Sequence, residues 1–415
     1  MNNSQLDAIE EVTLRRHAQA AVFESIFTSV TLVGGDIAVK GFDAEAWMVT
    51  LIAMAPGISQ LLSLGLSRPM AHFGRRRLLR WAALLGRLPM FLLLFVSGPM
   101  PFLSLLTLQA VAGVIITTSW NSLLRSNYRD AQRGRLYARA ARIGALSGGL
   151  ALVLSGYWLE RDPEAYRYVF AIAAIAGVLS CFIFSEIQVR APLSRAEQPG
   201  HSLRELWNTL AADQYFLRFQ LGFFLYGLAF MSISIARPLE MAGDDRLDFS
   251  YQTLLGARGV FSLSVLLSTL MMGRMLDRVG PATLAQRCYF LLAVYSGLLY
   301  FTYYPPVYFV AEALYGVSMA GITIAWNLGP VTMAPTAGAA ANYMLVHVGL
   351  VGVRSLIGHP LAWLVIECTD APRLVFLMGV VLFAAAGLTM VRLARELKKR
   401  PIPVPAPTAP AETIQ

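Results

Sequence analysis

GRMLDRVG, residues 273–280, places two glycines, two arginines and an aspartate in eight positions. Apolar runs flank it on both sides, VLLSTLMM directly before it and CYFLLAVYSGLLYF shortly after it. Glycine has no side chain, so it lets a chain turn sharply and approach its neighbours closely. We therefore predict a short, charged, tightly turning loop between two apolar helices.

A related stretch, SRPMAHFG, lies upstream at residues 67–74. A step of 206 residues carries Gly74 onto Gly280, and the same step carries Trp120 onto Trp326. One offset that aligns two separate landmarks indicates that a unit of about half the chain is written twice.

The composition places much of the surface against lipid. The chain has 415 residues, of which 56% are hydrophobic and 14% charged, whereas a soluble protein of this size has roughly a quarter charged. The net charge of +9 does not indicate nucleic acid, because the arginines form short clusters between apolar runs instead of one basic surface.

A membrane helix needs about 20 mostly apolar residues. The sequence offers twelve such spans, at 18–38, 45–66, 78–98, 101–124, 136–158, 168–185, 216–236, 251–272, 282–303, 306–328, 341–366 and 374–391. With these spans, 25 of the 34 Lys and Arg residues fall on the side of the N-terminus and six on the opposite side. This imbalance predicts that both termini are cytoplasmic.

We expect an all-α integral membrane protein with five parts. They are a cytoplasmic N-terminal tail (1–17), a six-helix half (18–185), a cytoplasmic linker (186–215), a second six-helix half (216–391) and a basic, Pro-rich cytoplasmic tail (392–415).

Six spans, a linker and six spans, with a Gly/Asp/Arg loop after the second span of each half, resemble the major facilitator superfamily. The signature of that family in this loop is Gly-x-x-x-Asp-Arg/Lys-x-Gly-Arg-Arg/Lys. The second copy matches it at Gly273, Asp277, Arg278 and Gly280, although Pro281 replaces the next basic residue. The first copy keeps Gly74 and Arg75 but has Ser67 for the glycine and Ala71 for the aspartate.

The resemblance covers about residues 15–395. It implies two pseudo-symmetric six-helix halves that rock around a midplane site, in a multi-pass protein of the bacterial cytoplasmic (inner) membrane. It also implies that the loop aspartate reaches a helix of the other half when the cavity is closed to the cytoplasm. Asp277 would then face Arg133 and Arg135, whereas Ala71 would face the uncharged loop GPVTMAPTAGAA. We predict a cytoplasmic gate that is latched on one side only.

Charged side chains inside spans are costly and usually face a bundle interior or an aqueous cavity. The sequence predicts two pairs, Glu24–Arg142 and Glu312–Arg258, with Arg354 free for substrate, and His347 completes the set of cavity and proton-coupling candidates. The alternative is that each pair only holds helices together. For Arg87, on a peripheral span, a structural partner is the favoured interpretation. The glycines at 144, 148 and 149 are explained either by a glycine-rich antiporter segment or by close helix packing.

No metal-binding histidine pair, phosphate loop or nucleophile elbow occurs in a suitable context, so we expect no enzyme activity, no cofactor and no metal. The first hypothesis is a secondary transporter of a small solute with the proton as candidate coupling ion. Arginines outnumber glutamates in the spans, which favours an organic anion. The alternatives are a proton-coupled exporter of lipophilic drugs and a non-transporting membrane scaffold or sensor. The expected partners are the substrate and the lipid bilayer, without nucleic acid, and the protein is expected to be a monomer.

Overall fold

The computed structural model describes residues 7–72, 74–189, 203–336 and 339–399, and every regular element in these ranges is helical. The first half contains α1 (Ala8–Leu32), α2 (Gly34–Phe42), α3 (Ala46–His72), α4 (Arg75–Ala82), α5 (Pro99–Asn127), α6 (Asp130–Arg161) and α7 (Tyr166–Ser185). The second contains α8 (Leu203–Ala212), α9 (Gln214–Ala242), α10 (Tyr251–Tyr300), α11 (Pro305–Met333), α12 (Ala340–Thr369) and α13 (Pro372–Leu397). Residues 190–202 of the predicted linker and 400–415 of the predicted C-terminal tail lie outside the described residues.

Eight helices of the described residues are long and apolar enough to cross a membrane, or nine if α1 and α2, which bend by 42°, form one span. The 50-residue α10 is counted once, although it contains two of the predicted spans. The two remaining predicted spans correspond to α3, whose apolar part is Ala46–Leu62, and to the irregular segment from α4 to Leu94. The helices are therefore consistent with twelve spans.

The sequence predicts a loop at residues 273–280, but in the structure the non-helical part is limited to one residue. The helix runs on through Gly273 and Asp277, and the backbone departs from helical geometry only at Gly280, with φ 76° and ψ 168°. Pro281 follows and begins the next helical segment, where its fixed φ is compatible with a first turn. One residue therefore makes the whole turn.

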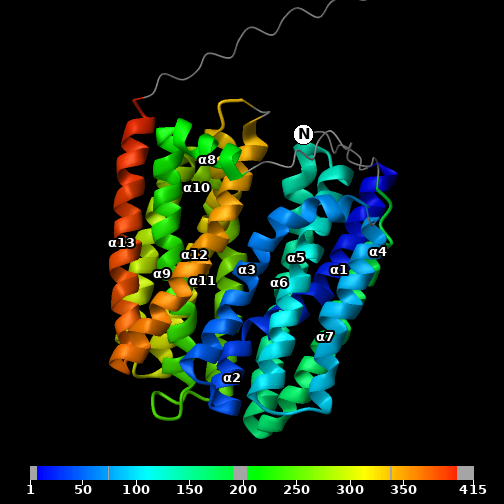
Figure 1. Cartoon of the computed structure of the whole chain (residues 1–415), viewed down its shortest axis with the longest axis vertical. Helices are drawn as coiled ribbons and strands as arrows, with labels where there is room; N and C mark the ends of the chain where they lie inside the picture. Colours follow the sequence, from blue (N-terminus) through cyan, green and yellow to red (C-terminus); the bar gives the residue numbers. More distant parts are fainter. Residues whose placement is uncertain (1–6, 73, 190–202, 337–338, 400–415) are drawn as a thin grey trace, which may run out of the picture.

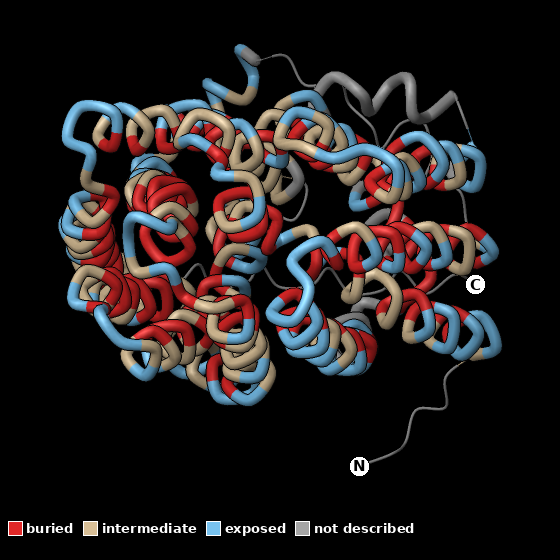
Figure 2. The backbone as a smooth tube through the Cα atoms, turned by 90° about the horizontal axis from the view of Figure 1, so that it is seen from below, coloured by how far each residue is buried: buried red, intermediate tan, exposed pale blue. Residues whose placement is uncertain are grey.

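Close contact between α6 and α1 depends on two glycines. A Cβ atom at Gly144 would lie 2.4 Å from the Ser25 Oγ, and one at Gly148 would lie 2.5 Å from the Ser29 Oγ. This geometry favours the packing interpretation of the glycine-rich segment. Away from such contacts, exposed residues follow the outer side of the bundle and buried ones the faces between helices (Figure 2).

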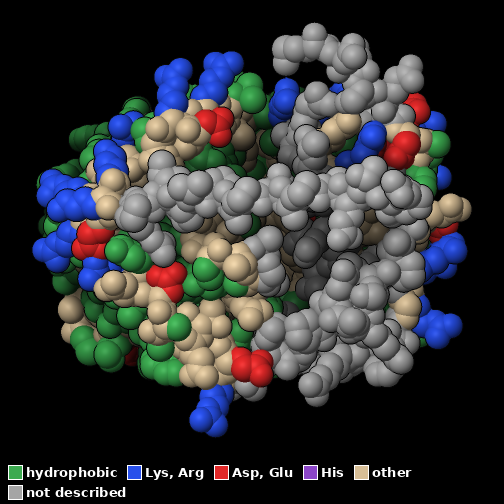
Figure 3. Space-filling model, turned by 90° about the horizontal axis from the view of Figure 1, so that it is seen from above, with side chains coloured by type: hydrophobic (Ala, Val, Ile, Leu, Met, Phe, Trp, Pro, Cys, Tyr) green, Lys and Arg blue, Asp and Glu red, His purple; other side chains and the backbone are tan. Residues whose placement is uncertain are grey.

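The helix α1 begins and α13 ends at the same end of the bundle, which we call the terminal end; α2 lies at the other end, which we call the far end (Figure 1). Lys and Arg side chains project around the rim of the terminal end (Figure 3). Most of the exposed charge of this face is thus basic, as the count of Lys and Arg in the sequence predicts.

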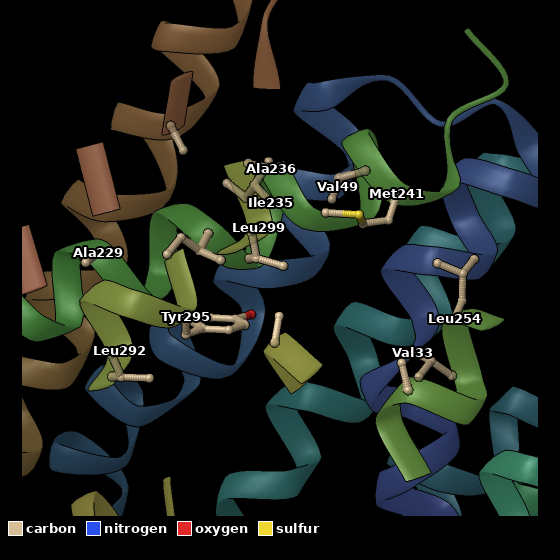
Figure 4. Close-up of a cluster of buried hydrophobic side chains, with 14 of the residues drawn as sticks. Val33, Val49, Ala229, Ile235, Ala236, Met241, Leu254, Leu292, Tyr295 and Leu299 are labelled. Carbon is tan, nitrogen blue, oxygen red and sulfur yellow. The ribbon is translucent and has the colours of Figure 1, made fainter. Parts of the chain in front are cut away.

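The two halves meet from the far end to the middle of the bundle. At the far end Lys40 forms an ion pair with Asp248, and a Cβ at Gly156 would lie 3.0 Å from the Leu255 Cβ. Nearer the middle, a Cβ at Gly352 would lie 2.1 Å from the Leu61 Cγ. One hydrophobic cluster contains residues of both halves, among them Val49 beside Met241 (Figure 4). At the terminal end the buried residues instead form two separate clusters, one in each half.

Candidate functional site

A cavity of about 420 Å³ lies between the two halves. It is lined from the first half by α1, α2, α3 and α5, and from the second by α9, α10, α11, α12 and α13. Its polar and charged lining residues are Thr28, Thr31, Asp36, Gln60, Gln109, Ser234, Arg237, Arg258, Ser355 and His359, besides two tyrosines. The cavity thus combines residues that the sequence places more than 300 positions apart.

Four buried charges form a chain that ends at this cavity. Asp36 Oδ2 lies 3.8 Å from Arg237 Nη2, and Arg237 Nη1 lies 3.5 Å from Glu312 Oε1. Arg258 Nη1 lies 3.1 Å from the other oxygen, Glu312 Oε2. Asp36 belongs to the first half and the other three to the second, so the chain of charges crosses between the halves.

Local structure places Asp36 at this position. The bend between α1 and α2 falls at Val33, just before two glycines, and it puts Asp36 in the first turn of α2. The positive end of a helix dipole stabilises a carboxylate there. Gly34 also packs closely against α5, where a Cβ atom on it would lie 2.8 Å from Leu106 Cδ1.

Some polar atoms of these four charged side chains have no hydrogen-bond partner among the described residues. Asp36 Oδ1, Arg237 Nε and Arg258 Nε are buried and form no hydrogen bond with any residue that the structure describes. Burying such an atom without a hydrogen bond costs about 1–3 kcal/mol. A solute in the cavity that offers a donor to Asp36 and an acceptor to the arginines would satisfy them.

The second half adds an aromatic wall. Tyr315 stacks on Phe261 with ring centroids 4.6 Å apart and on Tyr295 with centroids 4.8 Å apart, and all three line the cavity. His359 also lines it, and its Nδ1 donates to the Ser355 carbonyl oxygen at 2.9 Å. The wall provides a flat apolar face beside the charged chain.

Of the two predicted charge pairs, Glu312–Arg258 is confirmed as a contact and Glu24–Arg142 is wrong. The carboxylate of Glu24 accepts from both terminal nitrogens of Arg87 at 2.6 Å and from Ser180 Oγ at 2.8 Å. Arg142 is exposed and is not among the residues that line the cavity. The pair with Arg87 forms because residues 83–87 adopt a π-helical turn that ends at Arg87.

The prediction that Arg354 is free for substrate is also wrong. Arg354 is buried, and it donates through Nη1 to the Phe223 carbonyl at 2.5 Å and through Nε to the Leu350 carbonyl at 3.2 Å. His347 is buried as well, with Nδ1 2.8 Å from Gln220 Oε1. Both residues lie inside the second half because α12 turns their side chains toward α9, away from the cavity.

Asp36 and Arg237 were not predicted as site residues. Arg237 was counted with a loop on the opposite side, and Asp36 lies near the end of its predicted span. Two sequence signals point to them: Asp36 follows the Gly34-Gly35 pair within an apolar run, and Arg237 directly precedes a proline that lies inside α9.

The structure describes the side chain of Asp277 but not those of its predicted partners in the gate. Asp277 and Arg278 are exposed, and within the described ranges Asp277 forms no side-chain hydrogen bond or ion pair. Gly74 is exposed at the start of α4, and the side chains of Arg75, Arg133 and Arg135 lie outside the described residues. The latch between Asp277 and Arg133 or Arg135 stays a prediction.

Within the part of the chain that the structure describes, no group of three or more His, Cys, Asp or Glu residues could hold a metal ion.

The family model of the Major Facilitator Superfamily matches residues 25–353. A mutant of the nucleoside transporter NupG is similar in structure, with TM-score 0.70 and 13% identity over 92% of this chain and 99% of that one. A D-xylose–proton symporter has TM-score 0.68 and 14% identity over 94% and 99%. A bacterial homologue of the human lysosomal transporter Spinster has 0.64 and 14% over 96% and 100%. Among curated proteins no match was found.

Proposed function

We propose that this chain, which belongs to the major facilitator superfamily, is a secondary active transporter that moves a small solute by alternating access. The observation that carries the proposal is the chain of buried charges, because it borders the cavity and crosses from one half to the other. We place the terminal end in the cytoplasm of a bacterium, on the basic residues of that end. The structure then corresponds to a state that is closed toward the outside.

The contact between Asp36 of α2 and Arg237 of α9 connects the two halves toward the far end. Opening the far end would move α2 away from α9 and would separate these two side chains. A carboxylate that has lost its cation inside a low-dielectric bundle binds a proton more readily. Asp36 is therefore our first candidate for the proton-coupling residue, and Glu312, which shares Arg237, is the second.

The charges at the cavity are balanced once the residue behind its wall is counted. Asp36, Arg237 and Arg258 line the cavity, and Glu312, which does not line it, pairs with both arginines. Among the described residues, Arg87, Arg142 and Arg354 do not line the cavity. The excess of arginine that favoured an organic anion therefore lies elsewhere in the molecule. We propose instead a net-neutral solute with hydrogen-bonding groups and one flat face for the aromatic wall. The nucleoside and D-xylose named for two of the similar structures are of this general kind.

A lipophilic drug exporter is the second candidate. It is favoured by apolar lining residues on the second half, such as Phe230, Met231 and Phe383. Such a substrate would contact the aromatic wall and would leave the unpartnered polar atoms of Asp36 and the arginines unsatisfied. Because that is costly, we rank it below the polar solute.

The test is uptake into proteoliposomes, with and without an imposed pH gradient. The panel contains an uncharged nucleoside, a neutral pentose, an aromatic carboxylate and a lipophilic cation. We expect the gradient to drive accumulation of a neutral polar solute. Asp36→Asn should abolish this accumulation, so that the inside concentration rises only to the outside one, while counterflow exchange persists.

Glu24→Gln is the matched control, because Glu24 is also an intramembrane carboxylate paired with arginine but does not line the cavity. It should retain gradient-driven accumulation. Transport of the carboxylate alone would contradict the proposed substrate class, and equal loss in the two variants would remove Asp36 from coupling. Exclusive transport of the cation would favour the exporter.

A further inference from the structure

A second hollow lies at the terminal end, between α1 and α6. It has a volume of about 600 Å³ and is lined by Glu11, Leu14, Arg15 and Ala18 of α1 and by Arg139, Ala140 and Ile143 of α6. It shares no lining residue with the central cavity. We call it the α1–α6 groove.

The groove is continuous with an apolar outer face of α6. Ile143, Leu146 and Leu150 are 44%, 60% and 60% exposed and follow one another at helical spacing of three and four residues. On α1, the residues that line the central cavity, such as Thr28 and Thr31, lie further along the helix, ten or more residues beyond Ala18, the last residue of the groove. In a membrane, acyl chains would cover the outer face of α6, so the groove lies where that face ends.

The charged side chains of the groove have no partner among the described residues. Glu11, Arg15 and Arg139 are exposed, and none of their side chains forms a hydrogen bond or ion pair with another described residue. The preceding residue, Glu10, provides a contrast, because it is buried and holds Arg129 at 2.6 Å. The groove therefore presents two guanidinium groups and one carboxylate above an apolar floor.

We propose that the α1–α6 groove binds a phospholipid whose headgroup carries a phosphate and a primary ammonium group. Guanidinium groups match phosphate oxygens in geometry and charge, and two of them here come from different helices. A primary ammonium has three N–H donors for the Glu11 carboxylate, whereas a quaternary ammonium has none. One acyl chain lies along Ile143 and the exposed leucines below it. Basic pockets between membrane helices at the cytoplasmic side bind lipid headgroups in the same way.

The experiment is native mass spectrometry of the full chain in detergent, titrated with phosphatidylethanolamine, phosphatidylcholine or phosphatidylglycerol of identical acyl chains. We expect the ethanolamine lipid to bind most tightly. Arg139→Ala should weaken its binding on the order of tenfold, the loss expected for one charge-assisted hydrogen bond. Glu11→Gln should remove the preference for ethanolamine over choline and leave binding of both lipids measurable.

Arg16→Ala is the matched control, because Arg16 is an exposed arginine beside Arg15 that does not line the groove. It should bind the ethanolamine lipid as the unsubstituted chain does. Equal binding of all three lipids, or an equal loss in Arg16→Ala and Arg139→Ala, would overturn the proposal. Tightest binding of phosphatidylglycerol would also overturn it and would indicate a general anion site. All the substituted side chains are exposed, and thermal unfolding of each variant checks that it is folded.

Discussion

At the scale of single residues, Gly280 explains how so hydrophobic a chain reverses direction within one position. Its φ of 76° and ψ of 168° lie in a region that is essentially restricted to glycine. Gly273, seven residues earlier in the same motif, is helical and has no neighbouring atom within 4 Å of an added Cβ. The two glycines of one motif therefore have different physical roles.

This difference predicts the effect of alanine at each position. Gly280→Ala should lower the free energy of unfolding by about 1–3 kcal/mol, the cost of holding a non-glycine residue in this conformation. Gly273→Ala should leave it unchanged or raise it by up to about 1 kcal/mol, because alanine favours the helix. Thermal unfolding in detergent, followed by intrinsic fluorescence, measures both. Similar shifts in the two variants would contradict the assignment of the turn to Gly280.

Residue positions within spans predicted one charge pair and missed another. Glu312 and Arg258 lie at a similar distance from the same membrane face, and their side chains also point toward each other, so the predicted contact forms. Glu24 and Arg142 also lie at similar depth, but the sequence does not show which way each side chain points around its helix. Depth without orientation was not enough, because Glu24 points toward Arg87 and Arg142 is exposed.

At the scale of helices, the third predicted span departs most from regular structure. It consists of α4, a π-helical turn at Ala83–Arg87 and a 3-10 helix at Leu88–Leu94. The irregular turn presents Arg87 to Glu24, and the guanidinium also lies 4.4 Å from the centroid of the Phe27 ring and donates to the Gly177 carbonyl. The structure thus supports a structural partner for Arg87.

Removing one member of this pair should be more harmful than removing both. Arg87→Met leaves the carboxylate of Glu24, which is 23% exposed, without its cation, and should cost about 3 kcal/mol of unfolding free energy. The double variant Glu24→Gln with Arg87→Met should recover much of that loss. Arg142→Met should cost little. Denaturant or thermal unfolding of the unsubstituted chain, of Glu24→Gln and Arg87→Met alone and of the double variant gives the coupling energy. Simple additivity of the two substitutions would refute the pairing.

The sequence predicted the helical segments well because each needs only a long apolar run. It did not predict the bend between α1 and α2 or the irregular third span, because the Gly34-Gly35 pair and Pro89 at these places allow a break in a helix without requiring one. Asp36 illustrates the consequence. Its ion-pair partner, Arg237, lies on α9 and is more than 190 residues away in the sequence. No pattern in the residues around Asp36 shows which residue will be its partner.

At the scale of the whole molecule, the halves share one hydrophobic cluster toward the far end and have separate clusters at the terminal end. In alternating access, the halves would separate at the far end and come together at the terminal end. The link between Asp36 and Arg237 favours the state observed here, and the predicted latch of Asp277 with Arg133 or Arg135 would favour the opposite one. A contact of about 1–2 kcal/mol shifts a balanced equilibrium roughly tenfold, so either residue is sufficient to change the populations.

Pulsed electron resonance distances across both ends test this central claim most directly. One pair of spin labels replaces the exposed Ser97 and Asp245 at the far end, and the other replaces Arg16 and Arg395 at the terminal end, each in a Cys368→Ser background because Cys368 is exposed. With Asp36→Asn, the far-end distance should lengthen and the terminal-end distance should shorten. Asp277→Asn should change the distances in the reverse sense or leave them as in the unsubstituted chain. Unchanged distances in Asp36→Asn, or changes of the same sign at both ends, would contradict alternating access governed by this link.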